Sequence, residues 1–301
     1  MSGFYSKSDV ESRIGLIVLN YQTVEDTIEC LNSIRKYYEN LTIVVVDNHS
    51  LKEKMDVLSA YLEKSENIYL LQLDQNYGFA KGFNKGISFL RKKGFSYIAC
   101  SNNDILFQSE GILESLLDTQ RMYHAAILGP SIYNLNGISQ NPCYTSRLTK
   151  RDATFLLFQT SLPVIFLKLV LPSSVLSYLD KLVQKRQNPG ICALPKNAPC
   201  EVYSLHGAFI LFAPPFFEKN VGFDDYTFLY GEELILSEMM VRQGLSEYYD
   251  PRVRILHKED RTSDFVWGGQ KKLEPYLIAR RSMKYWYSHY FKKNLTKIRN
   301  E

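Results

Sequence analysis

The sequence lacks several features that would place the protein in a specialised class. Its five cysteines form no CxxC pair and have no metal-type spacing, and their odd number argues against a disulfide framework. The net charge is only +4, which is too small to indicate nucleic-acid binding. These absences favour an ordinary globular protein with reduced thiols. We therefore expect a cytoplasmic protein that binds no nucleic acid.

Long uninterrupted apolar runs are also missing. The first eleven residues are mostly polar, so we expect no secretory signal. The most apolar stretch, residues 155–171, has about the minimum length for a membrane span but contains Pro163 and Lys168. We expect it to lie at an interface or to act as a lid. A helical pair packed on the core is the alternative.

What the chain does contain is a repeated alternation of apolar runs and helical patterns. The runs 14–19, 41–46, 68–73 and 95–100 predict buried strands, and residues with helical spacing lie between them. This alternation is typical of βαβ units, so we predict an α/β fold with a mostly parallel sheet flanked by helices. The main domain should span residues 1–265.

The alternation fails over residues 137–199, which contain six prolines and an apolar helical middle. We interpret this stretch as a helical insertion in the main domain. Residues 266–301 form a helical C-terminal extension. From residue 271 onward, nine Lys and Arg residues stand against two acids, with six aromatic residues among them. That composition suits a membrane surface, and a homodimer contact is equally compatible with it.

Polar side chains follow three of the predicted strands. Asn20 and Asp47 end the first and second strands, and Asn102, Asn103 and Asp104 follow the fourth. Ligands of open α/β sheets bind beyond the carboxyl ends of the strands. A carboxylate in such a polar cluster can hold a hydrated cation and a phosphate. The structural alternative is a turn, which Asn and Asp favour.

Glycines at 78, 82 and 86 recur every four residues at the start of a predicted helix. They would allow a ligand to approach the backbone closely and would leave N–H groups near the helix N-terminus. A dinucleotide fingerprint needs GxGxxG directly after the first strand, where this chain has Asn20-Tyr21. A nicotinamide or flavin enzyme is therefore not favoured.

Two adjacent acids, Glu232 and Glu233, begin a predicted helix after Gly231. The helix macrodipole alone would explain them. Neighbouring side chains on one helical turn point in different directions, so one acid can also accept a proton in a cleft while the other anchors the loop. His257 follows a short predicted strand, where it is either structural or part of a divalent-ion shell.

Six motifs occur in an order that resembles one family, the family-2 glycosyltransferases of the GT-A fold, particularly their rhamnosyltransferase-like branch. The resemblance covers residues 14–257 apart from the insertion. The motifs are Val45-Val46-Asp47-Asn48-His49-Ser50, Asn76-Tyr77-Gly78-Phe79-Ala80-Lys81-Gly82-Phe83-Asn84-Lys85-Gly86, Asn102-Asn103-Asp104, Gly207-Ala208-Phe209, Phe228-Leu229-Tyr230-Gly231-Glu232-Glu233 and His257.

The resemblance implies an inverting glycosyltransferase that moves a sugar, rhamnose in this branch, from a UDP- or dTDP-sugar to a glycan or lipid-linked acceptor. The product would be a cell-surface polysaccharide, made at the inner face of the plasma membrane. Mg²⁺ or Mn²⁺ would be contacted by Asp104 and His257, and Glu233 would be the general base with Glu232 as its neighbour. The implied donor-binding residues are Asn20, Asp47, Asn76, Gly78, Lys81, Asn84, Asn102 and Asn103.

The chain departs from the family pattern at two of these positions. Asn102 replaces an acid, which removes one negative charge from the metal site, and Glu233 replaces an Asp, which lengthens the base by one methylene. Two other functions remain open. A catalytically silent subunit would bind the nucleotide-sugar without transferring it. A nucleotidyltransferase would carry a Gly-rich, basic loop after the first strand, which residues 20–23 do not provide.

Overall fold

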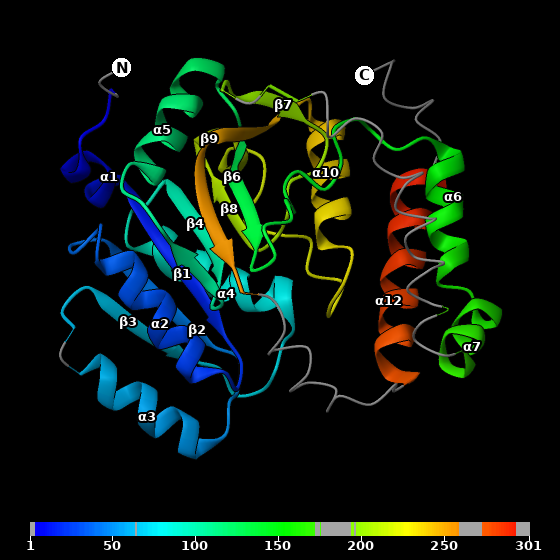
Figure 1. The fold of residues 1–301 in the computed structure, drawn as a ribbon, viewed down its shortest axis with the longest axis horizontal. Helices are drawn as coiled ribbons and strands as arrows, with labels where there is room; N and C mark the ends of the chain where they lie inside the picture. Colours follow the sequence, from blue (N-terminus) through cyan, green and yellow to red (C-terminus); the bar gives the residue numbers. More distant parts are fainter. Residues whose placement is uncertain are drawn as a thin grey trace.

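The computed structural model describes residues 4–63, 65–171, 175, 194–195, 197–258 and 273–292. Within them, nine strands form one sheet with helices on both faces (Figure 1). The strands are β1 (Ile14–Asn20), β2 (Thr42–Asp47), β3 (Ile68–Gln72), β4 (Tyr97–Asn102), β5 (Ile105–Phe107), β6 (Ile127–Asn134), β7 (Cys200–Val202), β8 (Phe209–Phe212) and β9 (Glu247–His257). Their order is β3-β2-β1-β4-β8-β6-β9-β5, and β7 pairs with β9.

The first four strands are parallel, as the sequence predicts. They are continuous apolar runs because both of their faces are covered. Leu16 and Val18 face one core cluster, and Ile17 faces the other. The register places Asn20 beside Asp47, so the polar ends of β1 and β2 lie at one edge of the sheet.

The other half of the sheet is mixed. Strand β8 runs antiparallel to β4 and β6, whereas β9 runs parallel to β6. Strands β5 and β7 are both antiparallel to β9. The expectation of a mostly parallel sheet therefore describes the first four strands, because only those are joined by successive helical crossovers. Pairing of Ile105 with His257 brings Asp104, which precedes β5, next to the end of β9.

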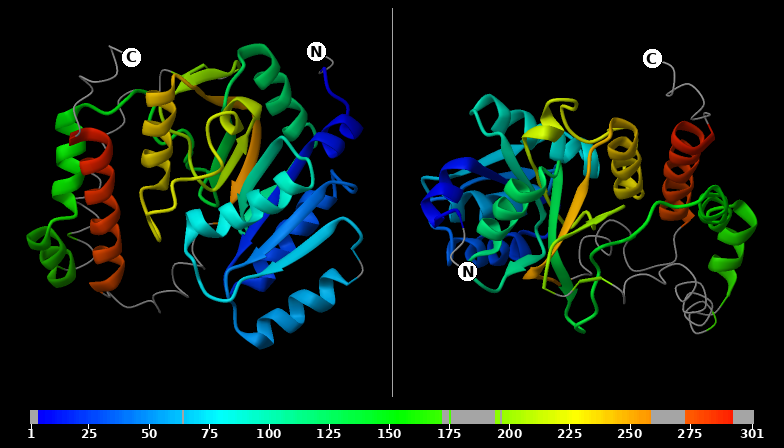
Figure 2. Two further views of the ribbon diagram at one scale, coloured as in Figure 1. Left: turned by 180° about the vertical axis from the view of Figure 1, so that it is seen from behind. Right: turned by 90° about the horizontal axis from the view of Figure 1, so that it is seen from above.

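Helices cover the two faces of the sheet in separate groups. Helices α1, α2, α3 and α5 pack on one face, and α4, α9 and α10 pack on the other (Figure 2). The helices are α1 (Lys7–Arg13), α2 (Val24–Arg35), α3 (Lys52–Leu62), α4 (Phe79–Lys92), α5 (Ile112–Tyr123), α6 (Lys150–Gln159), α7 (Leu162–Val170), α9 (Pro214–Phe217), α10 (Glu232–Gln243) and α12 (Leu273–Trp286), followed by the π-helical segment η2 (Tyr287–Lys292).

A third apolar cluster lies beside the sheet. Ala153 from α6, Ile235 from α10 and Trp286 from α12 are buried in it, and α6, α7 and α12 stand together beyond α10 (Figures 1 and 2). Within the insertion, α6 and α7 form a helical pair that packs on α12, whereas residues 137–148 are not helical, which corrects the start of the predicted helical insertion. No single described helix is long and apolar enough to cross a membrane. Helices α6 and α7 meet that criterion only as a pair, with a bend of 49° between them.

Residues 273–292 of the C-terminal extension are helical, as predicted, but their aromatic side chains do not all face outward. Trp286 is fully buried and Tyr290 nearly so, and the indole N–H of Trp286 donates to the carbonyl of Leu234 at 3.2 Å. The interpretation of these two aromatic residues as membrane contacts is wrong, because they pack against α10. Lys271, Lys272 and the residues beyond 292 lie outside the described part of the chain.

Candidate active site

The ends of β1 and β2 hold a buried polar network. Asp47 is only 2% exposed. Its Oδ1 accepts from Nδ2 of Asn20 at 2.6 Å and from Oγ of Ser50 at 2.5 Å, and its Oδ2 accepts from the backbone N–H of Ser50 at 2.9 Å. Both carboxylate oxygens are thus already used within the protein. The predicted roles of Asn20 and Asp47 in donor binding remain predictions.

Strand β4 extends two residues further than the sequence predicts, because the N–H of Asn102 donates to the carbonyl of Ala208 at 2.9 Å. Asn103 is buried, with its Nδ2 at 2.7 Å from Oγ1 of Thr23 and 2.9 Å from Oγ1 of Thr27. Asn102 and Asp104, on either side of it, are partly exposed. Of the three predicted site residues, Asn103 therefore anchors the strand end from within.

Asp104 faces His257. Oδ1 of Asp104 is buried and accepts no hydrogen bond from any described residue, and it lies 3.3 Å from Nε2 of His257. Nδ1 of His257 is 2.8 Å from Oε1 of Gln140, which places the ring proton on Nδ1 and leaves the Nε2 lone pair toward Asp104. Two electron-rich atoms then face each other, an arrangement that a cation between them would stabilise.

The donor set fits a divalent ion. Ligands at neighbouring positions of a six-coordinate ion with bonds of about 2.1 Å lie about 3 Å apart, close to the separation of these two atoms. The described ranges contain no group of three or more His, Cys, Asp or Glu side chains around one point. An ion held by Asp104 and His257 would therefore take its other ligands from a diphosphate and from water.

The glycines at the start of α4 make room for protein atoms. Gly78 has φ +79°, and a Cβ there would lie 2.1 Å from the carbonyl oxygen of Phe228. At Gly82 and Gly86 a Cβ would meet the side chains of β1. The N–H of Gly78 donates to Oδ1 of Asn76 at 2.9 Å. Protein atoms therefore fill the space beside these glycines, and the interpretation that a ligand occupies it is wrong. The prediction of free N–H groups near the helix N-terminus is contradicted at Gly78. The donor-binding role of Gly78 and Asn76 stays a prediction.

Asn84 and Lys81 lie on α4 in different surroundings. The side-chain amide of Asn84 donates to the carbonyl of Phe223 at 2.9 Å and accepts from its N–H at 2.8 Å. Asn84 thus ties the loop before α10 to α4. Lys81 is exposed, so its ammonium group is accessible to a ligand. Their roles in donor binding remain predictions.

The two acids at the start of α10 occupy different environments. Glu232 is buried, and its Oε1 accepts from Oγ1 of Thr227 at 3.3 Å. Burial, followed by the charge of Glu233, raises the pKa of Glu232 to about 8, so it is mostly protonated at neutral pH. Glu233 is partly exposed, and its Oε1 accepts from the N–H of Gly207 at 3.4 Å. Glu233 is therefore the acid that a ligand can reach.

One short segment, His206–Ala208, connects the predicted metal ligands with the predicted base. The rings of His206 and His257 are 5.6 Å apart between centroids. The next residue, Gly207, contacts Glu233, and Ala208 is bonded to the end of β4 as described above. Asp104 and Glu233, which are more than a hundred residues apart in the sequence, thus both lie near His206–Ala208.

Several residues that shape the site were missed by sequence reasoning. Gln140 orients His257, and the N–H of Lys258 donates to the carbonyl of Asp104 at 2.9 Å. Nζ of Lys258 is 2.6 Å from Oδ1 of Asp26 on α2. The adjacency of Lys258 to His257 is the only signal in the sequence for its position. Gln140 carries no such signal, because it lies in the insertion.

Comparisons with known proteins agree with this geometry. Residues 16–164 match the family model for glycosyl transferase family 2. The glycosyltransferase GlyG of Streptococcus pneumoniae serotype 4 (strain ATCC BAA-334 / TIGR4) is 25% identical over 122 residues, which are 40% of this chain and 39% of GlyG. Among solved structures, GalNAc-T7 with UDP, GalNAc and Mn²⁺ aligns with a TM-score of 0.59 at 13% identity, over 92% of this chain and 49% of that one. TarS 1-349 of S. aureus aligns with a TM-score of 0.47 at 14% identity, over 79% of this chain and 60% of that one.

The alignment with GalNAc-T7 shows the GT-A fold, and the predicted fold class is confirmed. The family model and the match to GlyG support a family-2 glycosyltransferase. The chain spans about two fifths of the length of GlyG and about half of the GalNAc-T7 chain.

Proposed function

We propose that this protein transfers a sugar from a UDP- or dTDP-sugar to a hydroxyl of a glycan or lipid-linked acceptor, with inversion at the anomeric carbon. The observation that carries the proposal is the close approach of Oδ1 of Asp104, which accepts no described hydrogen bond, to Nε2 of His257, at the sheet edge that Glu233 also borders. Rhamnose as the sugar and polysaccharide synthesis as the process rest on the motif resemblance alone, and a cytoplasmic location rests on that resemblance and on the cysteine content.

Asp104 and His257 would hold Mg²⁺ or Mn²⁺, which neutralises the charge that develops on the leaving diphosphate. Asn102 contributes an amide in place of a second carboxylate, so this chain supplies one negative charge at that position. The donor diphosphate supplies the rest when it binds. Binding of the ion and of the donor should therefore depend on each other.

Glu233 is the proposed general base. The acceptor oxygen forms a bond to the anomeric carbon, the bond from that carbon to the diphosphate oxygen breaks, and the hydroxyl proton passes to Glu233. A single displacement of this kind inverts the configuration. Glu232 cannot take the role at neutral pH because it already carries a proton, and its contact with Thr227 holds the loop instead.

Replacing Glu233 by Gln tests the proposal. We expect the variant to hydrolyse UDP- or dTDP-sugars about 10²–10⁴-fold more slowly in the presence of Mg²⁺ or Mn²⁺, because the base is lost. Nucleotide affinity, measured by isothermal titration calorimetry with UDP and dTDP, should stay unchanged. Glu53→Gln is the matched control, since Glu53 is an exposed acid in the first turn of α3.

Two results would count against this function. Wild-type protein that binds a nucleotide but hydrolyses no donor in the panel would favour the catalytically silent subunit. Equal hydrolysis rates for Glu233→Gln and the wild type would remove Glu233 from the role of base.

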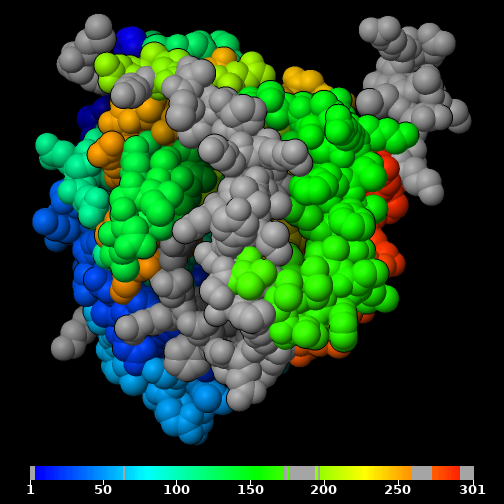
Figure 3. Space-filling view, turned by 45° about the vertical axis from the view of Figure 1, so that its right-hand side comes forward, coloured from blue at the N-terminus to red at the C-terminus, as the bar shows by residue number. Residues whose placement is uncertain are grey.

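We also propose peripheral contact between α6–α7 and an anionic membrane surface. Phe158, Leu162, Phe166 and Val170 recur every four residues and are between 55 and 68% exposed. The pair forms one side of the molecule (green in Figure 3). Lys150, Arg151 and Lys168 on the same two helices would favour anionic lipids.

The membrane contact can be measured by co-sedimentation with phosphatidylglycerol–phosphatidylcholine vesicles. The double variant Phe158→Ser with Phe166→Ser should lose most of the binding. The control Val221→Ser, which changes an exposed apolar residue outside α6 and α7, should not. Binding that the double variant retains would refute this contact. A dimer that the same variant dissociates, in analytical ultracentrifugation, would assign the face to a second copy of the chain instead.

A further inference from the structure

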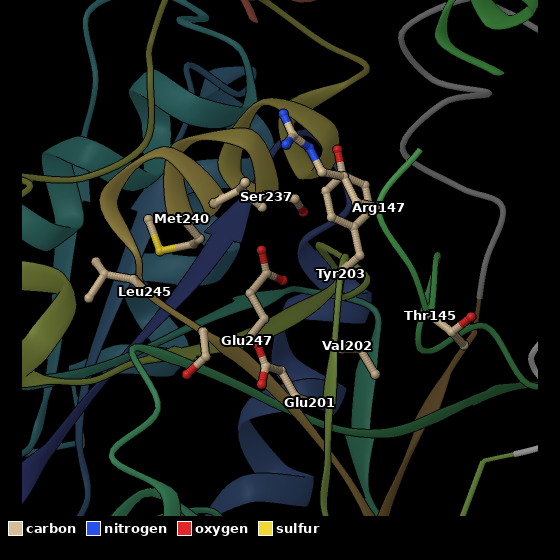
Figure 4. A pocket seen from close by; sticks show the side chains of 11 residues that line it. Thr145, Arg147, Glu201, Val202, Tyr203, Ser237, Met240, Leu245 and Glu247 are labelled. Carbon is tan, nitrogen blue, oxygen red and sulfur yellow. The ribbon is translucent and has the colours of Figure 1, made fainter. Parts of the chain in front are cut away.

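A cavity of about 290 Å³ lies beside α10. Ser237 and Met240 of α10 line one wall, and Tyr203, which follows β7, lines another. Figure 4 shows the carboxyl group of Glu247, at the start of β9, among these side chains. The cavity is far larger than the roughly 30 Å³ that one water occupies, so it has room for a small organic ligand.

Glu247 presents an unpartnered polar atom to this cavity. The residue is 3% exposed, and its Oε2 accepts from the N–H of Leu205 at 3.0 Å. Its Oε1 is buried and accepts no hydrogen bond of standard geometry in the part of the chain that the structure describes, although the hydroxyl of Ser237 lies near the carboxyl group. Buried polar groups normally have a partner, so a group that enters the cavity should hydrogen-bond this oxygen.

The cavity carries little uncompensated charge inside. Nε and Nη2 of Arg147 lie 3.0 and 2.8 Å from the two carboxylate oxygens of Glu238, and the hydroxyl of Tyr203 also donates to Glu238, at 2.7 Å. Burial raises the pKa of Glu247 to about 8. Glu201, the remaining acid of the lining, is exposed. A phosphate or a nucleotide would therefore find no free positive charge among the lining residues.

The walls divide into a polar and an apolar part. Thr145, Tyr203, Ser237 and Ser246 bring hydroxyl groups to the lining. The apolar part consists of Val202, Met240, Val241 and Leu245. A neutral sugar ring has hydroxyls around its rim and apolar C–H groups on its faces, so it matches both parts at once.

We propose that this cavity is a binding site for one neutral sugar unit, with a sugar hydroxyl bonded to Oε1 of Glu247. The unit is either a free monosaccharide or one residue of a glycan. Asp104 and His257 do not line this site. Leu205–Gly207 connects it with Glu233, since Leu205 bonds Glu247 and Gly207 bonds Glu233. The proposal does not require that the protein transfer a sugar.

Saturation-transfer NMR and calorimetry on the full chain would test this site, with UDP added and divalent ions omitted. The probes are D-glucose, L-rhamnose, N-acetyl-D-glucosamine, glucose 6-phosphate and maltotriose. We expect at least one neutral probe to bind, and glucose 6-phosphate to bind at least 10-fold more weakly than glucose. If maltotriose binds at least 10-fold more tightly than glucose, the ligand is a residue of a glycan. If the two affinities are equal, the ligand is a free sugar.

Variants place the binding in the cavity. Val241 lines the cavity and is 38% exposed, so Val241→Trp should fold and reduce sugar affinity at least 10-fold by filling the mouth. Val221→Trp makes the same change at a 92% exposed position and should leave affinity unchanged. Glu247→Gln keeps a donor and an acceptor and should bind within a few-fold of wild type. No binding by any neutral probe, or equal affinities for the two Trp variants, would overturn the proposal.

Discussion

At the ends of β1 and β2, Asp47 accepts three hydrogen bonds from Asn20 and Ser50, and both of its oxygens are used. In the mixed half of the sheet, Asp104 and Glu247 each keep one buried oxygen without a described partner. Both regions contain buried carboxyl groups. The protein satisfies Asp47 in the parallel half and Asp250 in the mixed half by itself, since both oxygens of Asp250 accept from Ser115, Thr119 or Arg252, but it does not satisfy Asp104 and Glu247 in the mixed half fully. The parallel half is thus built as a scaffold, and the mixed half holds the groups that await a ligand.

Among the changes that test this comparison, removal of the Asp104 carboxylate should have the largest effect, which is on Mn²⁺ binding. Asp104→Ala should weaken Mn²⁺ binding by about 100-fold or more, measured by electron paramagnetic resonance with UDP present, because a direct ligand is lost. The free energy of unfolding should change by less than about 0.5 kcal/mol, since Oδ1 of Asp104 makes no hydrogen bond with a described residue.

The matched change Asp47→Ala should do the opposite. It leaves the amide of Asn20 and the N–H of Ser50 without acceptors, so the free energy of unfolding in urea should fall by about 1–3 kcal/mol. Mn²⁺ affinity of the folded variant should stay near that of the wild type. If Asp47→Ala abolished Mn²⁺ binding while Asp104→Ala did not, the division between scaffold and ligand site would be reversed.

A smaller effect is expected from Glu247, through the pH dependence of stability. Burial raises its pKa from an ordinary value of 4.5 to about 8, so the folded protein holds a proton that the unfolded chain releases. The stability associated with this proton is complete below about pH 4.5 and is lost as the pH rises toward 8. Glu247→Gln should therefore gain on the order of 1 kcal/mol over the wild type between pH 5 and 8.

Urea unfolding at several pH values would measure this difference. Glu232, whose pKa is also raised, contributes equally to both proteins and cancels. Glu53→Gln serves as the exposed control and should follow the wild-type curve. Parallel curves for Glu247→Gln and the wild type would show that Glu247 does not hold a proton in the folded state.

The sequence was a good guide wherever one periodic pattern governed the structure. The apolar runs located β1 to β4 within about two residues, because parallel strands buried on both faces are continuous apolar segments. The carboxyl ends of those strands then placed Asn20 and Asp47 together. The adjacency of Glu232 and Glu233 also predicted that the two acids would lie in different environments, and Glu232 is buried whereas Glu233 is partly exposed.

Other parts of the site could not be read from the sequence. The glycine spacing around Gly78 indicates close approach of some atom, but the pattern is the same whether that atom belongs to a ligand or to Phe228. Glu247 carries no local signal, because its unpartnered oxygen results from packing between α10 and β9. Likewise, Trp286 in a basic, aromatic segment looks like a membrane contact until its partner Leu234 is known.

Helix α12 contacts the start of α10, which lies some fifty residues earlier in the chain. Oγ of Ser282 donates to the carbonyl of Leu229 at 2.8 Å, and the indole N–H of Trp286 donates to the carbonyl of Leu234. The turn that carries Glu232 and Glu233 is therefore fixed on both sides by residues of α12. On the ribosome, the N-terminal strands emerge and can pair first. A nascent chain that has not yet released Trp286 thus carries every strand of the sheet but lacks the bonds that set Glu233 in place.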